Sequence, residues 1–116
     1  MPVAELIPLT DLASCCAPLI KAPLEPQNAD SLARSLKALA DPARLRILSM
    51  VASHVDGEAC VCDLTEPLDL AQPTVSHHLK VLVEAGFLTR SKRGTWAYYR
   101  LVPGSLETVS SLLVGV

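Results

Sequence analysis

Residues 71–86, AQPTVSHHLKVLVEAG, decide the fold of this chain. Apolar residues recur there at steps of four and three, so they lie on one face of a helix: Val75, Leu79 and Leu82. Pro73 falls in the first turn, where its missing N–H costs no hydrogen bond, and Gly86 falls where a left-handed cap ends a helix. The opposite side carries short or forked hydrogen-bonding groups: Gln72, Ser76, His77 and Lys80. This pattern is typical of a DNA recognition helix.

Two strand-like segments follow this helix. Residues 87–93 and 95–101 flank Gly94, and a glycine at that place suits a tight hairpin turn. Three aromatic residues in the second segment favour a strand: Trp96, Tyr98 and Tyr99.

Two helices are predicted in the first half of the chain. Asn28 or Asp30 caps the first, while Asp41 followed by Pro42 begins the second, which runs to about Ser53. Their inward-facing residues are Leu32, Leu36 and Leu39 in the first, and Leu45, Leu48 and Val51 in the second.

A turn at residues 54–59 leads into a short third helix, which opens at Cys60 and Cys62 and is shortened by Pro67. A last helix follows Gly104 and has little core to cover with its apolar stripe: Leu106, Val109, Leu112 and Leu113. A second copy of the chain is the natural cover for this stripe, so we expect a homodimer.

Helices followed by a basic two-stranded hairpin predict an α+β, mostly helical fold. We expect a homodimeric winged helix-turn-helix with a two-stranded β-hairpin wing. Residues 1–27 are expected to form an N-terminal arm that bears cysteines, and residues 28–116 the winged helix-turn-helix domain for DNA binding and dimerisation.

The net charge of −2 and the pI near 5.8 at first argue against nucleic-acid binding. The charges are unevenly distributed, however, because residues 74–100 hold five of the ten Lys and Arg residues and one of the twelve acidic residues. Local charge matters more for DNA than the total. We assign Gln72, Ser76 and His77 to base edges, Thr74 and Lys80 to phosphates, and the hairpin's Arg90, Lys92 and Arg93 to phosphates or the minor groove.

The sequence shows neither a secretory segment nor a membrane-spanning run, so the expected location is the cytoplasm. In that compartment the four cysteines are predicted to be thiols or metal ligands rather than structural disulfides. Thiolates are soft ligands that select Zn, Cd, Pb or trivalent arsenic. On a regular helix, Cys60 and Cys62 point about 200° apart. They can therefore share one ion only if the helix start unwinds or if the pair lies just before the helix. In the first case, metal capture deforms the helix-turn-helix.

The order of elements, together with LKALADPARLRIL, the CVCDL run and QPTVSHHLKVL, resembles the ArsR/SmtB family of metal-responsive repressors. The resemblance covers roughly residues 30–114. It implies a homodimer that binds double-stranded operator DNA without metal and releases it when metal binds. Two residues depart from the family pattern: Ala71 stands where members often place a Ser cap, and Thr65 where some arsenic-sensing members carry a third cysteine.

Two sulfurs do not complete a site, and the adjacent Cys15 and Cys16 are the remaining source of sulfur. One of them would complete the three-sulfur pyramid of As(III) or Sb(III), making arsenite or antimonite the inducer. Both would give a four-sulfur site for Cd(II) or Pb(II), as in the cadmium- and lead-sensing branch of the family. The family's other site, a His/Asp cluster on the last helix, is excluded because residues 104–116 contain no His, Asp or Cys.

Two other classes of function remain to be compared. In a thiol-redox switch, oxidation of Cys60/Cys62 or of Cys15/Cys16 would release DNA without metal, but no cluster of basic residues adjoins these cysteines in the sequence to lower a thiol pKa. An enzyme such as an arsenate reductase is disfavoured, because Cys-x-Cys here lacks an anion-cradling loop and a catalytic base. We therefore predict a repressor and no enzymatic activity.

Overall fold

The computed structural model describes residues 17–115, which fall into two compact units. One contains the described residues up to Lys37 together with those from Pro103 onwards, and the other runs from Ala38 to Val102. Cys15 and Cys16 lie outside the described residues. In residues 17–115 no helix is both long enough and apolar enough to span a bilayer.

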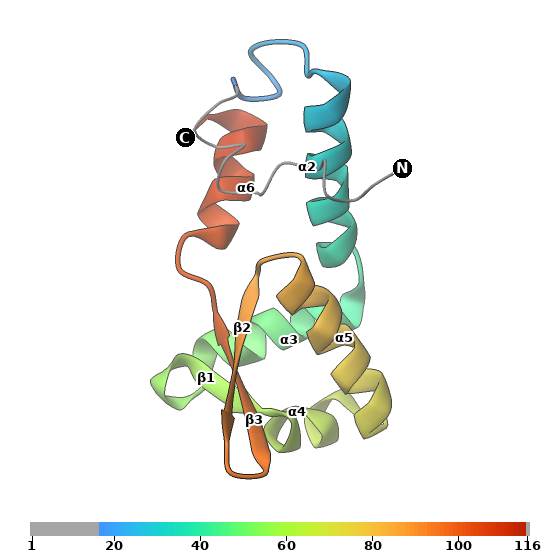
Figure 1. Cartoon of the computed structure of the whole chain (residues 1–116), viewed down its shortest axis with the longest axis vertical. Helices are drawn as coiled ribbons and strands as arrows, with labels where there is room; N and C mark the ends of the chain where they lie inside the picture. Colours follow the sequence, from blue (N-terminus) through green and yellow to red (C-terminus); the bar gives the residue numbers. More distant parts are fainter. Residues whose placement is uncertain (1–16, 116) are drawn as a thin grey trace. The chain divides into compact units, whose positions relative to one another are not determined.

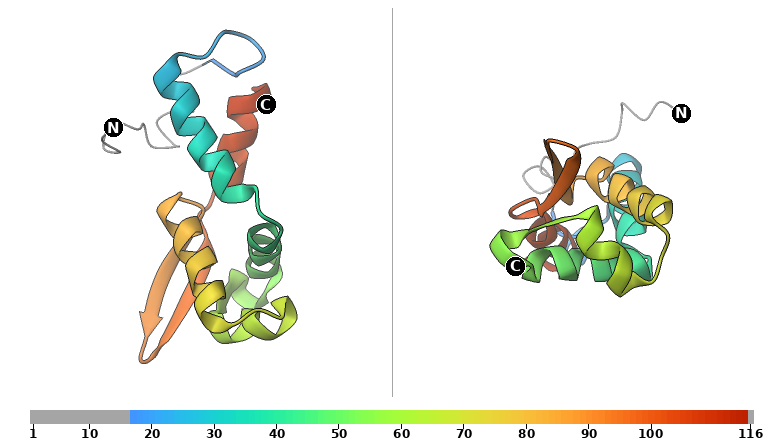
Figure 2. Two further views of the ribbon diagram at one scale, coloured as in Figure 1. Left: turned by 90° about the vertical axis from the view of Figure 1, so that its right-hand side faces the viewer. Right: turned by 90° about the horizontal axis from the view of Figure 1, so that it is seen from below.

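The first unit pairs two helices, α2 (Pro26–Leu39) and α6 (Ser105–Val114), which run side by side in both views (Figures 1 and 2). Leu32 and Leu112 are buried between them, and partly buried leucines surround this pair: Leu24, Leu36 and Leu113. Leu106 is 39% exposed, so the predicted stripe on α6 is narrower than expected.

Helix α2 begins at Pro26, so the predicted caps at Asn28 and Asp30 are wrong. Proline suits a first helical position because it lacks the N–H that would be unpaired there. The N–H of Ala29 already donates to the carbonyl of Glu25 at 2.9 Å, and this bond starts the helix upstream of both polar residues.

The second unit contains α3 (Pro42–Ser53), α4 (Val61–Leu68) and α5 (Gln72–Glu84). Asp41 begins α3 as predicted, because its carboxylate accepts hydrogen bonds from the N–H groups of Ala43 (2.9 Å) and Arg44 (3.2 Å). Burial opposes ionisation of this carboxyl, but the two N–H donors hold the pKa of Asp41 below its usual range.

Leu45 was predicted to face the core, but it is 54% exposed. The buried residues of α3 are Ile47, Leu48 and Val51. Ile47 lies about 200° from Leu45 around the helix axis, so a stripe that includes Ile47 turns Leu45 towards solvent.

The hairpin forms as predicted from β2 (Leu88–Arg93) and β3 (Trp96–Leu101). A third strand, β1 (Glu58–Cys60), pairs with the other edge of β3 and gives an antiparallel sheet of order β1-β3-β2. The prediction of a turn through residues 54–59 is therefore wrong for its second half. Three residues are too short to show an alternating pattern, and pairing with β3 makes this strand.

Helix α5 ends as its sequence indicates, with Gly86 at φ 90°, and Ala71 provides no side-chain cap. Helix α4 continues through Pro67 and ends one residue later at Leu68. The largest fully buried side chains all come from this second unit: Phe87, Ile47, Leu64, Leu79, Leu82, Leu88, Val51 and Val75. Together, α4, α5 and the β2–β3 hairpin form a winged helix-turn-helix, and we call this hairpin the wing (Figure 1).

We expect Asp41→Ala to lower the melting temperature at neutral pH, because two N–H groups of α3 lose their acceptor. Since the pKa of Asp41 is lowered in the folded chain, the carboxylate stabilises the fold above its unfolded pKa. This stabilisation is lost as the pH falls through the lowered pKa. Thermal unfolding between about pH 7 and pH 3 should therefore show the wild-type advantage shrinking towards acid.

The matched control is Asp41→Asn, whose side-chain oxygen accepts the same bonds without a charge. This variant should keep most of the stability at neutral pH. A difference between wild type and Asp41→Ala that stays constant down to acid pH would contradict the assignment.

Candidate DNA-binding surface and thiol site

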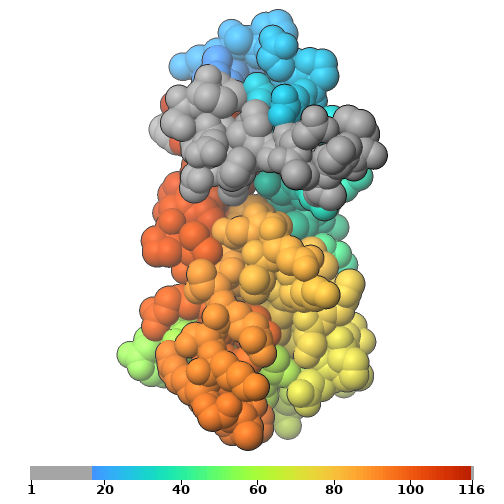
Figure 3. Space-filling model, in the orientation of Figure 1, coloured from blue at the N-terminus to red at the C-terminus, as the bar shows by residue number. Residues whose placement is uncertain are grey.

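The polar side of α5 faces solvent, while Val75, Leu79 and Leu82 are buried in the second unit. Four of the five residues assigned to DNA on this helix are exposed, and Ser76 is half-buried. The exposed four are Gln72, Thr74, His77 and Lys80. In the space-filling view, the surfaces of α5 and of the wing lie next to each other on one face of this unit (Figure 3). The structure thus brings the two predicted DNA-contacting elements together.

The three predicted cations of the wing are all exposed, but they lie on two faces of the sheet. Arg90 and Lys92 lie on the same face of the sheet as Leu88 and Tyr99, whose side chains are buried. Arg93 lies on the other face, opposite Trp96. The sequence analysis assigned all three cations to DNA together, whereas the strand alternation separates Arg93 from the other two.

Arg93 is bound within the protein by Glu58 of β1. Its Nη1 and Nη2 atoms donate to the two carboxylate oxygens of Glu58 at 2.7 and 2.8 Å, and its guanidinium lies 4.6 Å from the centroid of the Tyr98 ring. Arg100 donates to the same carboxylate at 3.2 Å. The hydrogen bonds from Arg93 hold the pKa of Glu58 below its ordinary value despite the opposing effect of burial, and the same contact raises the pKa of Arg93.

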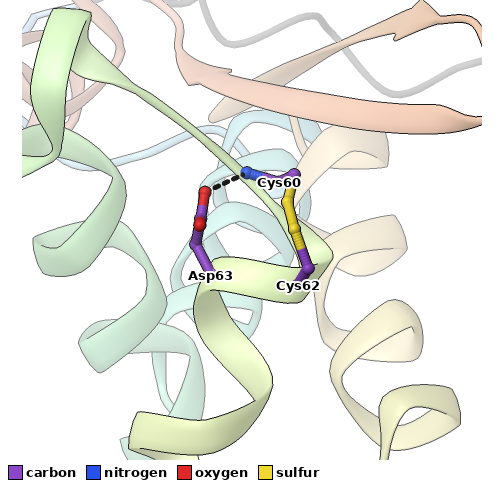
Figure 4. A group of neighbouring side chains, drawn as sticks. All are labelled: Cys60, Cys62 and Asp63. Atoms are coloured by element: carbon purple, nitrogen blue, oxygen red, sulfur yellow. Dashed lines mark hydrogen bonds between the residues drawn. A yellow bond between two sulfur atoms is a disulfide. The ribbon is translucent and has the colours of Figure 1, made fainter.

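The thiol site, formed by Cys60 and Cys62, lies where β1 becomes α4 (Figure 4). The two cysteines are joined in a disulfide, with their Cα atoms 5.3 Å apart. The prediction that these cysteines would be free thiols or ligands rather than a disulfide is therefore corrected for this pair. The close approach has a local cause, since Cys60 is still extended (φ −93°, ψ 166°) and Cys62 is already helical.

This geometry removes the reason to expect that the helix start must unwind. The angle of about 200° between side chains two residues apart applies only inside a regular helix. Cys60 instead precedes the helix as its N-cap, so the sulfurs of Cys60 and Cys62 meet while α4 remains intact. Neither predicted alternative is found as stated, because Cys60 lies just before the helix and Cys62 lies within its first turn. Cys60 is 3% exposed, whereas Cys62 is exposed to solvent.

Two polar residues that sequence reasoning did not assign to the thiol site lie beside it. The carboxylate of Asp63 accepts a hydrogen bond from the backbone N–H of Cys60 at 3.0 Å, and its Oδ2 lies 3.3 Å from Nε2 of His54. The ligand atoms of Cys60, Cys62 and Asp63 all lie within 4.8 Å of one another. Within residues 17–115 this is the one cluster of three or more His, Cys, Asp or Glu groups that could hold a metal ion.

His54, the first residue of the predicted turn, is exposed but lies beside Asp63. The turn through Asp56 and Gly57, both with positive φ, folds the chain back so that β1 can begin at Glu58. Nothing in the sequence spacing indicates this contact, because eight residues, including an unpredicted strand, lie between the two partners.

A model of the bacterial regulatory protein arsR family matches residues 41–90. The arsenic resistance transcriptional regulator ArsR1 of Pseudomonas putida is 46% identical over 80 residues, which cover 69% of this chain and 61% of that protein. The arsenical resistance operon repressor of Bacillus subtilis is 44% identical over 80 residues, covering 69% of this chain and 71% of the repressor.

Solved structures show the same likeness. A possible transcriptional regulator for arsenical resistance has a TM-score of 0.61 and 34% identity, over 68% of this chain and 79% of that one. The homodimeric winged helix-turn-helix domain Mb0332 of Mycobacterium bovis, a possible ArsR-family regulator, has a TM-score of 0.59 and 32% identity, over 78% and 82% of the two chains.

Because the two sulfurs lie together, we predict that the reduced pair binds reagents that take two thiols at once. In the Cys15→Ser/Cys16→Ser background, the reduced chain should bind about one equivalent of phenylarsine oxide, a trivalent arsenical that takes two thiols. Mass spectrometry of the intact chain checks this stoichiometry. Adding Cys62→Ser should abolish stable capture, and equal capture by that variant would show that the two sulfurs do not act together.

Proposed function

This chain belongs to the arsR family of bacterial regulatory proteins, and on that basis we propose that it is a homodimeric repressor of operator DNA whose inducer is trivalent arsenic or antimony. Cys60, Cys62 and one cysteine of the N-terminal arm bind the inducer in this proposal. The observation that carries it is the meeting of two sulfurs at the N-terminus of α4, the first helix of the helix-turn-helix.

Membership of this family makes the chain a transcriptional regulator and not an enzyme. Its place of action is therefore the chromosome in the cytoplasm. The polar face of α5 and the neighbouring wing supply the DNA contacts. Gln72, Ser76 and His77 contact base edges, while Thr74 and Lys80 contact phosphates. In the wing, Arg90 and Lys92 share a sheet face and contact the DNA backbone, and Arg93, which Glu58 holds at the tip, contacts phosphates or the minor groove.

Two copies of the chain present two such surfaces and read an imperfect palindrome with half-sites one or more turns apart. The likeness to the homodimeric Mycobacterium bovis domain supports this arrangement. Helices α2 and α6, at the two ends of the chain, are the proposed dimerisation elements.

Inducer binding requires the reduced pair. Arsenite is As(OH)₃ near neutral pH, and three thiols displace its three hydroxyl groups to form three As–S bonds and three molecules of water. Arsenic stays trivalent throughout, so this exchange needs no oxidant. Cys60 and Cys62 supply two sulfurs from one place, and Cys15 or Cys16 supplies the third. Because Cys60 is the N-cap of α4, a new bond from the arm pulls on the first helix of the helix-turn-helix.

Two alternatives share this fold. Cd(II) or Pb(II) as inducer would use all four cysteines, Cys15, Cys16, Cys60 and Cys62, since these larger soft ions accept four sulfurs. A thiol-redox switch would instead release DNA when Cys60 and Cys62 oxidise, and their disulfide is the observation that favours it. Titrating the operator complex separately with arsenite, Cd(II), Zn(II) and peroxide under chelation distinguishes these three possibilities.

We expect Cys60→Ser to leave operator affinity within about twofold of wild type, because the substitution does not touch the DNA contacts. It should abolish release by arsenite, because the inducer site loses one of its sulfurs. Fluorescence anisotropy of a labelled operator, with and without arsenite, measures both quantities. Cys15→Ser and Cys16→Ser, made separately, identify the third sulfur. Normal induction in Cys60→Ser would falsify the site.

The DNA assignments predict two different losses. Lys92→Ala should weaken binding to all sequences alike and reduce the slope of log K against log salt by about one unit, because one phosphate contact is lost. Gln72→Ala should relax discrimination at one base pair by about 1–3 kcal/mol and leave the salt slope unchanged. Lys21→Ala, an exposed cation of the first unit, is the control for charge alone. An unchanged salt slope in Lys92→Ala would remove this residue from the interface.

A further inference from the structure

Strand β1 carries two functional residues within three positions. Cys60 of the thiol site is its last residue, and Glu58 is its first. Both residues pair with β3 in the antiparallel sheet, where Glu58 lies opposite Arg100 and Cys60 lies opposite Tyr98. Cys60 of the thiol site and the carboxylate of Glu58 therefore lie on one three-residue strand and share β3 as their neighbour.

Glu58 joins this strand to the tip of the wing. Its two carboxylate oxygens hold Arg93, the last residue of β2, in a bidentate contact at 2.7 and 2.8 Å, and Arg100 adds a third bond at 3.2 Å. The side chain of Glu58 is only 15% exposed, although both arginine side chains are 52% exposed. A bidentate arginine–carboxylate pair fixes direction as well as distance, which a single ion pair does not.

The contacts form a closed path. The guanidinium of Arg93 lies over the ring of Tyr98, and Tyr98 is the register partner of Cys60. The path runs from Cys60 across the ladder to Tyr98, from there to Arg93, and through Glu58 back along β1 to Cys60. It connects the thiol site with the wing entirely within the second unit.

We propose that Glu58 is the positioning residue through which the state of Cys60 and Cys62 controls the wing. When the inducer binds the two sulfurs, the end of β1 shifts and Glu58 shifts with it. The wing then moves, and its cations no longer contact the DNA as they do in the free repressor. This inference rests on the proposed function only in taking Cys60 and Cys62 as the inducer site. Surface ion pairs generally add little to stability, so the expected role of Glu58 is directional.

The test compares three full-length proteins: wild type, Glu58→Gln and Glu66→Gln. Glutamine keeps the shape of the side chain but removes the charge that holds two arginines. Glu66 is an exposed acidic residue of α4, in the same unit, and provides the same change of charge away from the wing. The measured quantity is the ratio of operator Kd with and without sodium arsenite, and thiol titration establishes arsenite binding in each protein.

A second readout uses Trp96, the only tryptophan of the chain, which is half-exposed and stands opposite Arg93 at the tip of the wing. Its fluorescence reports the wing without DNA. It is recorded for the dithiol, the arsenite-loaded and the disulfide forms of each protein, with Cys15→Ser/Cys16→Ser versions included for the disulfide comparison.

We expect the wild-type and Glu66→Gln proteins to lose operator affinity by about 5- to 150-fold on arsenite binding. In Glu58→Gln the loss should fall to within about twofold of unity while its thiols still bind arsenite, and Trp96 should no longer respond. If Glu58→Gln releases DNA as the wild type does, with an equal Trp96 response, the proposal is overturned.

The proposed function can fail separately. If arsenite leaves the wild-type thiols untouched, that function is wrong, and the comparison of disulfide with dithiol decides the present inference instead. A Trp96 difference between these two forms in wild type that disappears in Glu58→Gln supports the coupling, and no difference in wild type overturns it. Should Glu58→Gln melt below the assay temperature, Arg93→Gln breaks the same pair from the other side, and the same ratio of Kd values is compared.

Discussion

The extended backbone at Cys60 is the constraint on which the rest of this structure depends. Cys60 is both the last residue of β1 and the N-cap of α4, so its side chain starts from extended backbone. The side chain of Cys62 starts from the first turn of the helix. Their sulfurs meet for that reason alone, and the helix is not distorted. The hydrogen bond from the N–H of Cys60 to the carboxylate of Asp63 keeps this junction in place, and His54 pairs with the same carboxylate. Because α4 starts at this junction, any ligand of the sulfurs acts on the first helix of the helix-turn-helix.

Strand alternation in the wing, together with the uneven distribution of charge, explains how a net acidic chain gathers cations on one face. Arg90 and Lys92 lie on the same face of the wing, and residues 74–100 contain a single acidic residue. Glu58, which comes from a different part of the sequence, holds Arg93 and Arg100 on the other face. The cations of the wing are therefore divided between an exposed pair and two arginines that share one carboxylate.

Much of the fold followed from local patterns. Asp41 with Pro42 correctly placed the start of α3, Gly86 the end of α5, and Gly94 the turn of the wing, because capping and turn geometry depend on one or two residues. Three predictions failed for physical reasons that are equally specific. Leu45 follows the helical spacing but lies outside the buried stripe of α3. Helix α2 starts upstream of its predicted caps. Strand β1 is too short to show a sequence pattern, and it forms by pairing with β3.

For the site, residue types and short spacings were enough to predict the candidate chemistry: two soft sulfurs with one residue between them, a helix with a polar face, and a cluster of basic residues after it. The chain carries those features wherever it folds. Three features of the site come from folding alone: Cys60 lies outside the helix, His54 and Asp63 adjoin it, and Glu58 holds the tip of the wing. Each of these depends on β1 pairing with a strand about forty residues away, and no local pattern specifies such a contact because its energy comes from partners that only folding brings together.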